Sequence, residues 1–209
     1  VEYKDGSHET IITDESWKVS ESEIRFSDIY HGEVCDACIV PSFDEAVETF
    51  DGPSDTLIPQ EGEKIVEQDI VHAAKLFMTP KGEWVVDFGQ EGTGYVEVTI
   101  DARAGETVKL SYGEVLDKDG NFYNENYRKQ NRAEFRYICR DGIQTYHPRL
   151  TFFGFRYIRI EEFPGGAENA TLDNFRAIVV HSDIKQTGKI TTSNLMLNRF
   201  IENVFWGQK

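Results

Sequence analysis

Residues 84–120, WVVDFGQEGTGYVEVTIDARAGETVKLSYGEVLDKDG, contain the pattern that decides the fold. Apolar and polar residues alternate over residues 95–100 and again over residues 107–112, which places one set of side chains on each face of a strand. The residues between these two runs include Gly105 and are few enough to form a hairpin turn. A helix would need apolar residues at every third and fourth position, and this stretch does not have them. The pattern therefore predicts a half-buried antiparallel sheet.

The composition fits a β protein of moderate size. The 209 residues are enough for one large β domain or two smaller ones. Fourteen Phe and nine Tyr suit sheet faces, and 17 Gly suit a fold with many tight turns. The formal net charge of −15 repels phosphate backbones and anionic lipid, so we expect neither nucleic acid nor a membrane as a partner. No apolar run approaches the roughly 18 residues that a membrane span needs.

The N-terminal residues and the cysteines bear on the cellular compartment of the protein. The first residues, VEYKDG, show no signal-peptide pattern and resemble a strand entering a turn, so we expect a chain cut from a longer one. The compartment, cytoplasmic or secreted, is therefore left open. Three Cys at irregular spacing argue against a disulfide framework. Cys35 and Cys38 form a CxxC without the two further ligands of a zinc site, and we interpret them as small side chains beside a strand, with a redox-active pair as the alternative.

Composition shifts divide the chain into four segments. Residues 1–40 contain a few short strand patterns, and residues 41–62 hold three of the six Pro and many acidic residues, as a linker would. Strand patterns separated by Gly-rich turns, one of them at residues 89–94, recur over residues 63–183, which predicts two packed antiparallel sheets in a jelly-roll-like β-sandwich. Residues 184–209 form a connection followed by a helix.

The C-terminal helix is predicted by its start signal and by its spacing. Thr192, Ser193 and Asn194 offer an N-cap, and apolar residues then recur at helical spacing up to Gly207. Two interpretations of this single amphipathic helix remain open. It folds back on the sandwich, or it is the first helix of a following helical domain.

Five stretches of the chain, in this order, resemble bacterial α-L-rhamnosidases. They are DGSHETIITDESWKVSESEIRFSDIYHGEVCDA (5–37), GEWVVDFGQEGTGYVEVTIDARAGETVKLSYGEVLDKDGNFYNEN (82–126), YHPRLTFFGFRYIRIE (146–161), VVHSDIKQTGKITTSN (179–194) and LNRFIENVFWGQK (197–209). The resemblance implies a multidomain glycoside hydrolase that releases terminal L-rhamnose. It also implies that the all-β part of this chain ends an N-terminal β-sandwich in residues 1–40 and forms a concanavalin-like β-sandwich in residues 63–183.

The same resemblance implies that the helix leads into a catalytic barrel of paired helices. The catalytic carboxylates of the family match no position of this chain, and neither do the calcium and rhamnose ligands of its N-terminal sandwich, so none is assigned. Thirty-seven acidic residues give many nominal carboxyl pairs, but none has a sequence context that would fix the separation a glycosidase needs.

Residues 117–132 form the longest irregular stretch, and a loop of that length is usually functional or covers an edge. Asp117, Asp119 and Asn121 offer oxygen ligands at alternate positions around Gly120, faintly like a calcium loop. An Asp-rich hairpin turn explains the same residues and is the interpretation we favour. A structural calcium is the alternative, and no other cofactor is expected.

The same loop carries the candidate sugar-binding residues. Aromatic rings stack on the CH faces of sugars while polar groups fix the hydroxyls, and this loop combines both kinds of side chain. The candidates are Tyr123, Asn124, Asn126, Tyr127 and Arg128. The alternative, which we favour, is that the aromatic residues anchor the loop to its own sandwich or to the catalytic barrel.

Three hypotheses for function follow. The chain is the non-catalytic part of an α-L-rhamnosidase, a stand-alone carbohydrate-binding module that takes rhamnose, or an autonomous hydrolase. We favour the first, in which this chain is inactive alone. Its expected partners are the catalytic barrel of the same parent chain, a rhamnose-containing glycan and, through exposed strand edges, a second copy of itself.

Overall fold

The computed structural model describes residues 1–52, 56–127 and 133–209, which divide by their contacts into two units. The first unit comprises residues 1–23 and 39–61, and the second comprises residues 24–38 and 62–209. The elements are β1 (Lys18–Val19), β2 (Ile24–Asp28), β3 (Gly32–Asp36), β4 (Glu45–Ala46), β5 (Ile65–His72), β6 (Lys75–Met78), β7 (Trp84–Ala102), β8 (Thr107–Gly113), β9 (Val115–Leu116), β10 (Phe122–Tyr123), β11 (Glu134–Ile138), β12 (Gly142–Tyr146), β13 (Phe153–Glu162), the 3₁₀ turns η1 (Ala167–Asn169) and η2 (Leu172–Asn174), β14 (Phe175–Ser182) and α1 (Leu195–Trp206). The predicted all-β fold with a C-terminal helix is confirmed.

The first unit has little regular structure. Its strands β1 and β4 form a two-stranded antiparallel pair, and Glu2 bridges to His8 around the turn that contains Gly6. Gly6 adopts a φ of 83°, which Gly reaches without the steric cost that other residues meet. The Asp5-Gly6 pair thus forms the turn that its sequence predicts.

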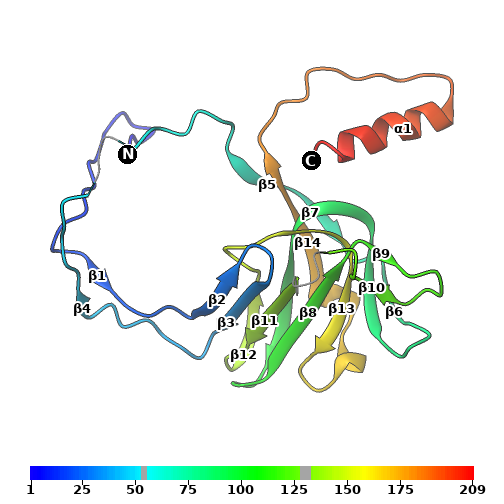
Figure 1. Cartoon of the computed structure of the whole chain (residues 1–209), viewed down its shortest axis with the longest axis horizontal. Helices are drawn as coiled ribbons and strands as arrows, with labels where there is room; N and C mark the ends of the chain where they lie inside the picture. The colour runs from blue at the N-terminus through cyan, green and yellow to red at the C-terminus, as the bar shows by residue number, and fades with distance from the viewer. Residues whose placement is uncertain (53–55, 128–132) are drawn as a thin grey trace. The chain divides into compact units, whose positions relative to one another are not determined.

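The second unit is built on one hydrogen-bonded sheet that curls around its own core (Figure 1). The strands follow the order β2-β3-β11-β8-β13-β7-β14-β5, and β12 and β6 also pair with β7. All of these pairs are antiparallel except β3 with β11, which run parallel. The parallel pair is an exception to the purely antiparallel sandwich that the strand pattern predicts.

Strand β7 connects different parts of the curled sheet because it is long enough to pair with different neighbours along its length. Its first part pairs with β6 and its second part with β12 and β14. The run 89–94, which the sequence predicts to be a turn between strands, lies inside β7 instead, where the register with β13 shifts. The expected turn is therefore wrong. The glycines allow a bend and a close approach, since a Cβ on Gly94 would lie only 1.9 Å from the carbonyl oxygen of Ile178 in β14.

Aromatic side chains fill the middle of the core. The fully buried ring of Tyr112 in β8 lies 4.5 Å from that of Phe153 and 4.9 Å from that of Phe155, both in β13. The Tyr112 hydroxyl accepts a hydrogen bond from the Val96 amide at 3.3 Å, so its polar atom is satisfied. Phe152, Phe153, Phe155 and Tyr157 follow a strand pattern that predicts core positions. Phe153, Phe155 and Tyr157 are buried, but the prediction is wrong for Phe152, which lies just before β13 and is exposed.

The hairpin β2–β3 belongs to the sheet of the second unit, although it precedes residues 39–61 of the first. Glu33 in β3 is 1% exposed, and its carboxylate accepts hydrogen bonds from the Tyr146 hydroxyl at 2.8 Å and from the Arg149 and Leu150 amides at 3.0 and 3.1 Å. Together with the β3–β11 ladder, these bonds hold residues 24–38 in the sandwich. The contacts thus divide the chain at other points than the predicted domain boundary near residue 40, which stays a prediction.

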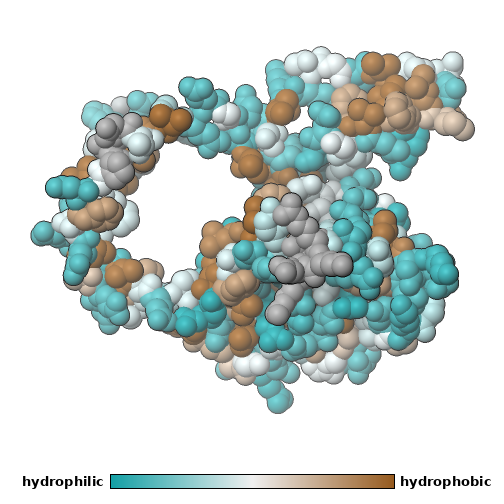
Figure 2. Space-filling model, in the orientation of Figure 1, coloured by the Kyte–Doolittle hydropathy of each residue, from teal (hydrophilic) through white to brown (hydrophobic). Residues whose placement is uncertain are grey.

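Helix α1 begins and ends where the sequence predicts. The Asn194 side chain accepts hydrogen bonds from the Met196 and Leu197 amides, and the helix ends at Gly207. Its apolar side chains are exposed, among them Leu195 at 83% and Phe200 at 63%, and Figure 2 shows hydrophobic atoms gathered along the helix. In the described part of the chain no helix is both long and apolar enough to cross a membrane.

Candidate functional site

The long loop starts from a short hairpin that the sequence predicts in part. Strands β9 and β10 pair in register, and the turn between them, residues 117–121, closes through a hydrogen bond from the Asp117 amide to the Asn121 carbonyl at 2.8 Å. Gly120 takes a φ of 82° at the tip of the turn. This turn supports the interpretation of the Asp-rich run as a hairpin.

The carboxylate of Asp117 organises the turn. It accepts hydrogen bonds from the Asn121 side chain and backbone amide and from the Asp119 amide, and Lys81 Nζ lies 3.5 Å away. The bonds from Asn121 are the main reason why the pKa of Asp117 falls to about 2. Among the described residues no group of three or more His, Cys, Asp or Glu side chains is arranged to hold a metal ion. The calcium alternative at Asp117, Asp119 and Asn121 stays a prediction.

We expect the turn at residues 117–121 to lose order in acid. The folded pKa of Asp117, about 2, lies below its ordinary value of 3.8, so the ionised carboxylate stabilises the turn above pH ~4. That stabilisation is lost as the pH falls through about 2. An NMR titration of the Asp119 and Asn121 amide shifts should show a midpoint near pH 2, which the variant Asp117→Asn should abolish. A midpoint near 4 would contradict the hydrogen-bonded geometry.

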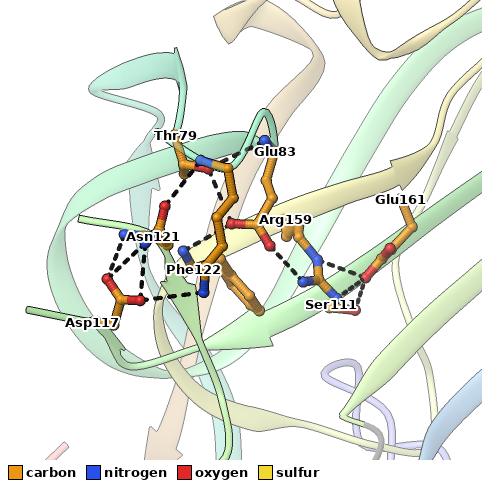
Figure 3. Close-up of polar contacts among 9 residues, drawn as sticks. Thr79, Glu83, Ser111, Asp117, Asn121, Phe122, Arg159 and Glu161 are labelled. Carbon is orange, nitrogen blue, oxygen red and sulfur yellow. Dashed lines mark hydrogen bonds and ion pairs between the residues drawn. The ribbon is translucent and has the colours of Figure 1, made fainter. Parts of the chain in front are cut away.

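A network of polar contacts fixes this hairpin to the sandwich (Figure 3). Glu83, at the start of β7, is its centre, since its carboxylate accepts from Thr79 Oγ1 at 3.0 Å, from the Phe122 amide at 3.1 Å and from Arg159 Nη1 at 2.8 Å. Burial raises the pKa of Glu83, but these three hydrogen bonds outweigh burial and hold the pKa below its ordinary value. Glu83 is thus an ionised carboxylate committed to structure.

The guanidinium of Arg159 connects the hairpin with the next strand. Besides Glu83, it donates from Nε to Glu161 Oε1 at 2.8 Å, and the Ser111 hydroxyl donates to the same oxygen at 2.7 Å. Its Cζ atom lies 4.9 Å from the centre of the Phe122 ring, within the range of a cation–π contact. The network therefore positions the residues that follow β10.

The candidate sugar-binding residues of the loop divide by their contacts. Tyr127 is partly buried against the core, and its hydroxyl donates to the Gly154 carbonyl at 2.7 Å. Asn126 donates from Nδ2 to Glu114 at 2.5 Å, and the Asn124 carbonyl accepts from the Tyr127 amide at 3.3 Å. Tyr123 is half-buried at the end of β10. Arg128 lies outside the described residues, and sugar binding by the set stays a prediction.

The contacts of Tyr127 favour an anchoring role for this side chain. Burial is the main cause that raises the pKa of Tyr127, and the nearby carboxylates of Glu114 and Glu91 raise it further, so the phenol is a neutral donor. The ring packs on the core and its hydroxyl is bonded to the backbone, so the side chain ties the loop to the sandwich. The structure thus favours loop docking over sugar stacking at this residue.

Two acidic residues next to Tyr127 were not singled out from the sequence. Burial raises the pKa of Glu91, and the Glu114 carboxylate raises it further, whereas Arg156 lowers it. Arg156 itself forms a bidentate pair with Asp87, at 2.8 and 2.9 Å. A carboxyl whose pKa is raised in this way, as that of Glu91 is, holds a proton more readily than an ordinary Glu. No local signal reveals it, because the bend inside β7 brings Glu91 to Glu114.

The three cysteines are not joined in disulfides. Cys35 and Cys139 are buried, whereas Cys38 is exposed and its Sγ donates to the Cys139 carbonyl at 3.1 Å. Burial raises the pKa of Cys139 to about 11, so this thiol stays protonated at neutral pH. These environments agree with the interpretation of small side chains in or beside strands.

Two family models match the chain in succession. The α-L-rhamnosidase N-terminal domain matches residues 1–68, and the bacterial α-L-rhamnosidase concanavalin-like domain matches residues 77–181. An α-L-rhamnosidase from Formosa agariphila is 29% identical over 99% of this chain. The match takes up only 23% of that relative's length.

Solved structures agree with the sequence matches. The Streptomyces avermitilis α-L-rhamnosidase, solved with L-rhamnose, superposes with a TM-score of 0.85 at 32% identity over 99% of this chain. The α-L-rhamnosidase from Dictyoglumus thermophilum superposes with a TM-score of 0.83 at 30% identity, again over 99% of the chain. This chain spans 21% and 24% of those two proteins. It therefore belongs to the bacterial α-L-rhamnosidase family, of which it carries the N-terminal and concanavalin-like domains.

Proposed function

We propose that this chain is the non-catalytic β-sandwich portion of an α-L-rhamnosidase and that it supports and orients a catalytic helical barrel of the same parent chain. One observation carries the proposal: two non-overlapping family models match residues 1–68 and 77–181, yet the chain spans less than a quarter of the length of the relatives described above. The exposed apolar side chains of α1, such as Leu195, Met196 and Phe200, support it, because surface of this kind is expected where helices pack together.

The environments of the carboxylates also favour a supporting role. Glu83, Asp87 and Glu161 are each bonded to an arginine, so their charges are compensated within the fold. Glu91 and Glu114 are the pair with the character closest to acid–base catalysis, since the pKa of Glu91 is raised by burial and by its neighbour. Glu91 is exposed and Glu114 is held by Asn126, which makes the pair a surface feature rather than a water-excluding site.

The domain boundaries and partners form part of the same proposal. Residues 1–40 would end the N-terminal sandwich, 41–62 would link it to the concanavalin-like sandwich in 63–183, and 184–209 would lead to the barrel. A rhamnose-containing glycan would be the substrate of the parent protein. The outermost strands of the sheet, β2 and β5, offer edges for association with a second copy, which light scattering can detect.

We expect the purified chain to release no p-nitrophenol from p-nitrophenyl α-L-rhamnopyranoside above a buffer control. Mixing it with the separately produced remainder of the parent protein should raise the activity of that remainder and its unfolding temperature by several degrees, because binding to the folded state stabilises it. A remainder that is unaffected by the chain would contradict the supporting role.

Hydrolysis by the chain alone would contradict its non-catalytic assignment, and the source of that activity can be checked. The variants Glu91→Gln and Glu114→Gln remove a carboxyl with a raised pKa and the neighbouring carboxylate that raises it further. The variant Glu162→Gln, in an exposed ion pair with Arg136, is the matched control. Release that these variants lower and the control leaves unchanged would place the activity at this pair.

A further inference from the structure

Four neighbouring strands of the second unit line a polar groove on the sheet face that points away from the core. The side chains of Val98 and Tyr146 point into the core, so the alternating residues Thr99 and Thr145 lie on the opposite face. The groove has a volume of about 410 Å³. Its lining residues are His72 of β5 and Ala73 after it, Glu97 and Thr99 of β7, Thr145 of β12, Leu172 and Asp173 of η2, and Phe175 and Arg176 of β14.

Strand register places the polar groups in two rows. Thr145 pairs with Thr99, and their hydroxyl oxygens lie 2.9 Å apart. In the next row Arg176 pairs with Glu97 on one side and with His72 on the other. These residues come from positions far apart in the sequence, and the sheet fixes their spacing. The groove therefore presents a carboxylate, a guanidinium, an imidazole and two hydroxyls in a fixed arrangement.

In the Arg176–Glu97 ion pair the carboxylate is mostly buried, whereas the arginine side chain is partly exposed. Nε of Arg176 donates to Glu97 Oε1, and the Glu97 side chain is 12% exposed whereas that of Arg176 is 44% exposed. One guanidinium edge thus holds the carboxylate, while a large part of the side chain faces the groove. A guanidinium presents five N–H donors in a rigid plane, so this edge can donate to ligand hydroxyls.

Apolar and aromatic surface accompanies the polar rows. Leu172 is 38% exposed at the edge of the groove. Beyond the end of β12, the His147 ring stacks on the Tyr95 ring, with centres 4.5 Å apart and planes 5° apart, and the Tyr95 hydroxyl donates to Glu67 at 2.6 Å. Both rings continue the same face of the sheet, because Tyr95 alternates with buried Val96.

The charge of the groove selects the class of ligand. Arg176 is compensated by Glu97, and Asp173 adds a further negative charge, so an anion such as a phosphate would be repelled. A purely apolar ligand would leave the threonine and guanidinium groups unpaired, which costs free energy. A neutral polyol with CH surface meets both conditions, and the volume lies within the range of small-ligand sites.

We propose that this groove binds a glycosyl unit of a neutral glycan. Arg176 and the two threonine hydroxyls would hydrogen-bond the sugar hydroxyls, and Leu172 would contact its CH surface. The choice of an α-L-rhamnoside as the probe rests on the proposed function. The groove itself does not, because it is argued from the register and charge of four strands.

The test is an NMR titration of the ¹⁵N-labelled chain with methyl α-L-rhamnopyranoside. We expect saturable shift changes of the Thr99, Thr145 and Arg176 amides, with a Kd in the millimolar range that corresponds to a weak single-site contact. Sodium phosphate at the same concentrations should leave these amides unchanged. The absence of shifts with the rhamnoside, or equal shifts with phosphate, would overturn the proposal.

Two substitutions with matched controls localise the binding. Thr145→Trp places a large side chain at an exposed position in the groove and should weaken binding at least about tenfold. Ile143→Trp, two residues earlier on the same strand and 78% exposed, should leave binding unchanged. Arg176→Gln should likewise weaken binding, whereas Arg136→Gln, from the exposed Arg136–Glu162 pair, should not.

The outcomes separate this proposal from the proposed function. Shift changes confined to Tyr123, Asn124, Asn126 and Tyr127, or full affinity in Thr145→Trp, would overturn the groove and leave the supporting role intact. The effect of the chain on its catalytic remainder should be the same for Thr145→Trp and the natural sequence. Failure of that assay with groove binding intact would contradict the supporting role alone.

Discussion

Replacing Gly94 with alanine should unfold or severely destabilise the sandwich. The added Cβ would lie 1.9 Å from the carbonyl oxygen of Ile178, a backbone atom that cannot move without separating β7 from β14. Because Gly94 pairs with both Phe153 and Val179, the displacement would reach three strands. We expect a loss of at least about 4 kcal/mol in the free energy of unfolding, the range in which single substitutions become exceptional.

Gly92 provides a matched control two residues earlier on the same strand. A Cβ there would lie 3.5 Å from Cγ2 of Val179, an ordinary van der Waals contact. Gly92→Ala should therefore change the free energy of unfolding by less than about 1 kcal/mol, and the lost flexibility of the unfolded chain works in its favour. Urea titrations followed by circular dichroism compare the two variants. Equal stability would contradict the close approach of β7 and β14.

Replacing Glu33 with alanine should be the second most damaging change. Its buried carboxylate accepts from the Tyr146 hydroxyl in the interior and from the Arg149 and Leu150 amides at part-buried positions, and removing it takes that acceptor from all three donors. An unsatisfied buried polar group costs about 1–3 kcal/mol, so we expect a loss of about 3–5 kcal/mol in total. Thermal and urea unfolding measure the effect.

The variant Glu33→Gln tests the mechanism of this loss. Its amide oxygen can still accept from the two backbone amides, and its NH₂ group can donate to the Tyr146 oxygen, so we expect a loss of only about 1–2 kcal/mol. The exposed Glu63→Ala is the control and should stay within about 0.5 kcal/mol of the natural sequence. An alanine variant as stable as the glutamine variant would mean that the donors find other partners.

Much of the fold could be predicted because the signals for it are local. Alternation in residues 95–100 and 107–112 predicted strands that the structure contains in β7 and β8, and the Asn194 cap with its following apolar spacing predicted α1 to the residue. The Asp-rich turn at residues 117–121 was likewise predicted from its own residues. In each case the side chains that decide the structure lie within a few positions of each other.

The features that the sequence did not predict depend on contacts between residues that are distant in sequence. The Gly-rich run inside β7 has the composition of a turn, and only its pairing with β13 makes it a bend in one strand. For Tyr127 the sequence allows either stacking on a sugar or anchoring of the loop, and the hydrogen bond to Gly154, 27 residues further along the chain, supports the anchoring that we favour. Glu91 and Glu114, and the groove around Arg176, depend on register between strands, which periodicity does not give.

The long sequence separation between β3 and its later partners has a consequence during synthesis of the chain on the ribosome. Glu33 leaves the ribosome before Tyr146, which lies 113 residues further on and supplies one of its hydrogen bonds. At typical elongation rates the hairpin β2–β3 would wait for roughly 5–20 s before its partners emerge. Throughout that interval the Glu33 carboxylate lacks its protein partners and is exposed to water on β3. This charge keeps the nascent hairpin hydrated and discourages premature pairing with other newly made chains.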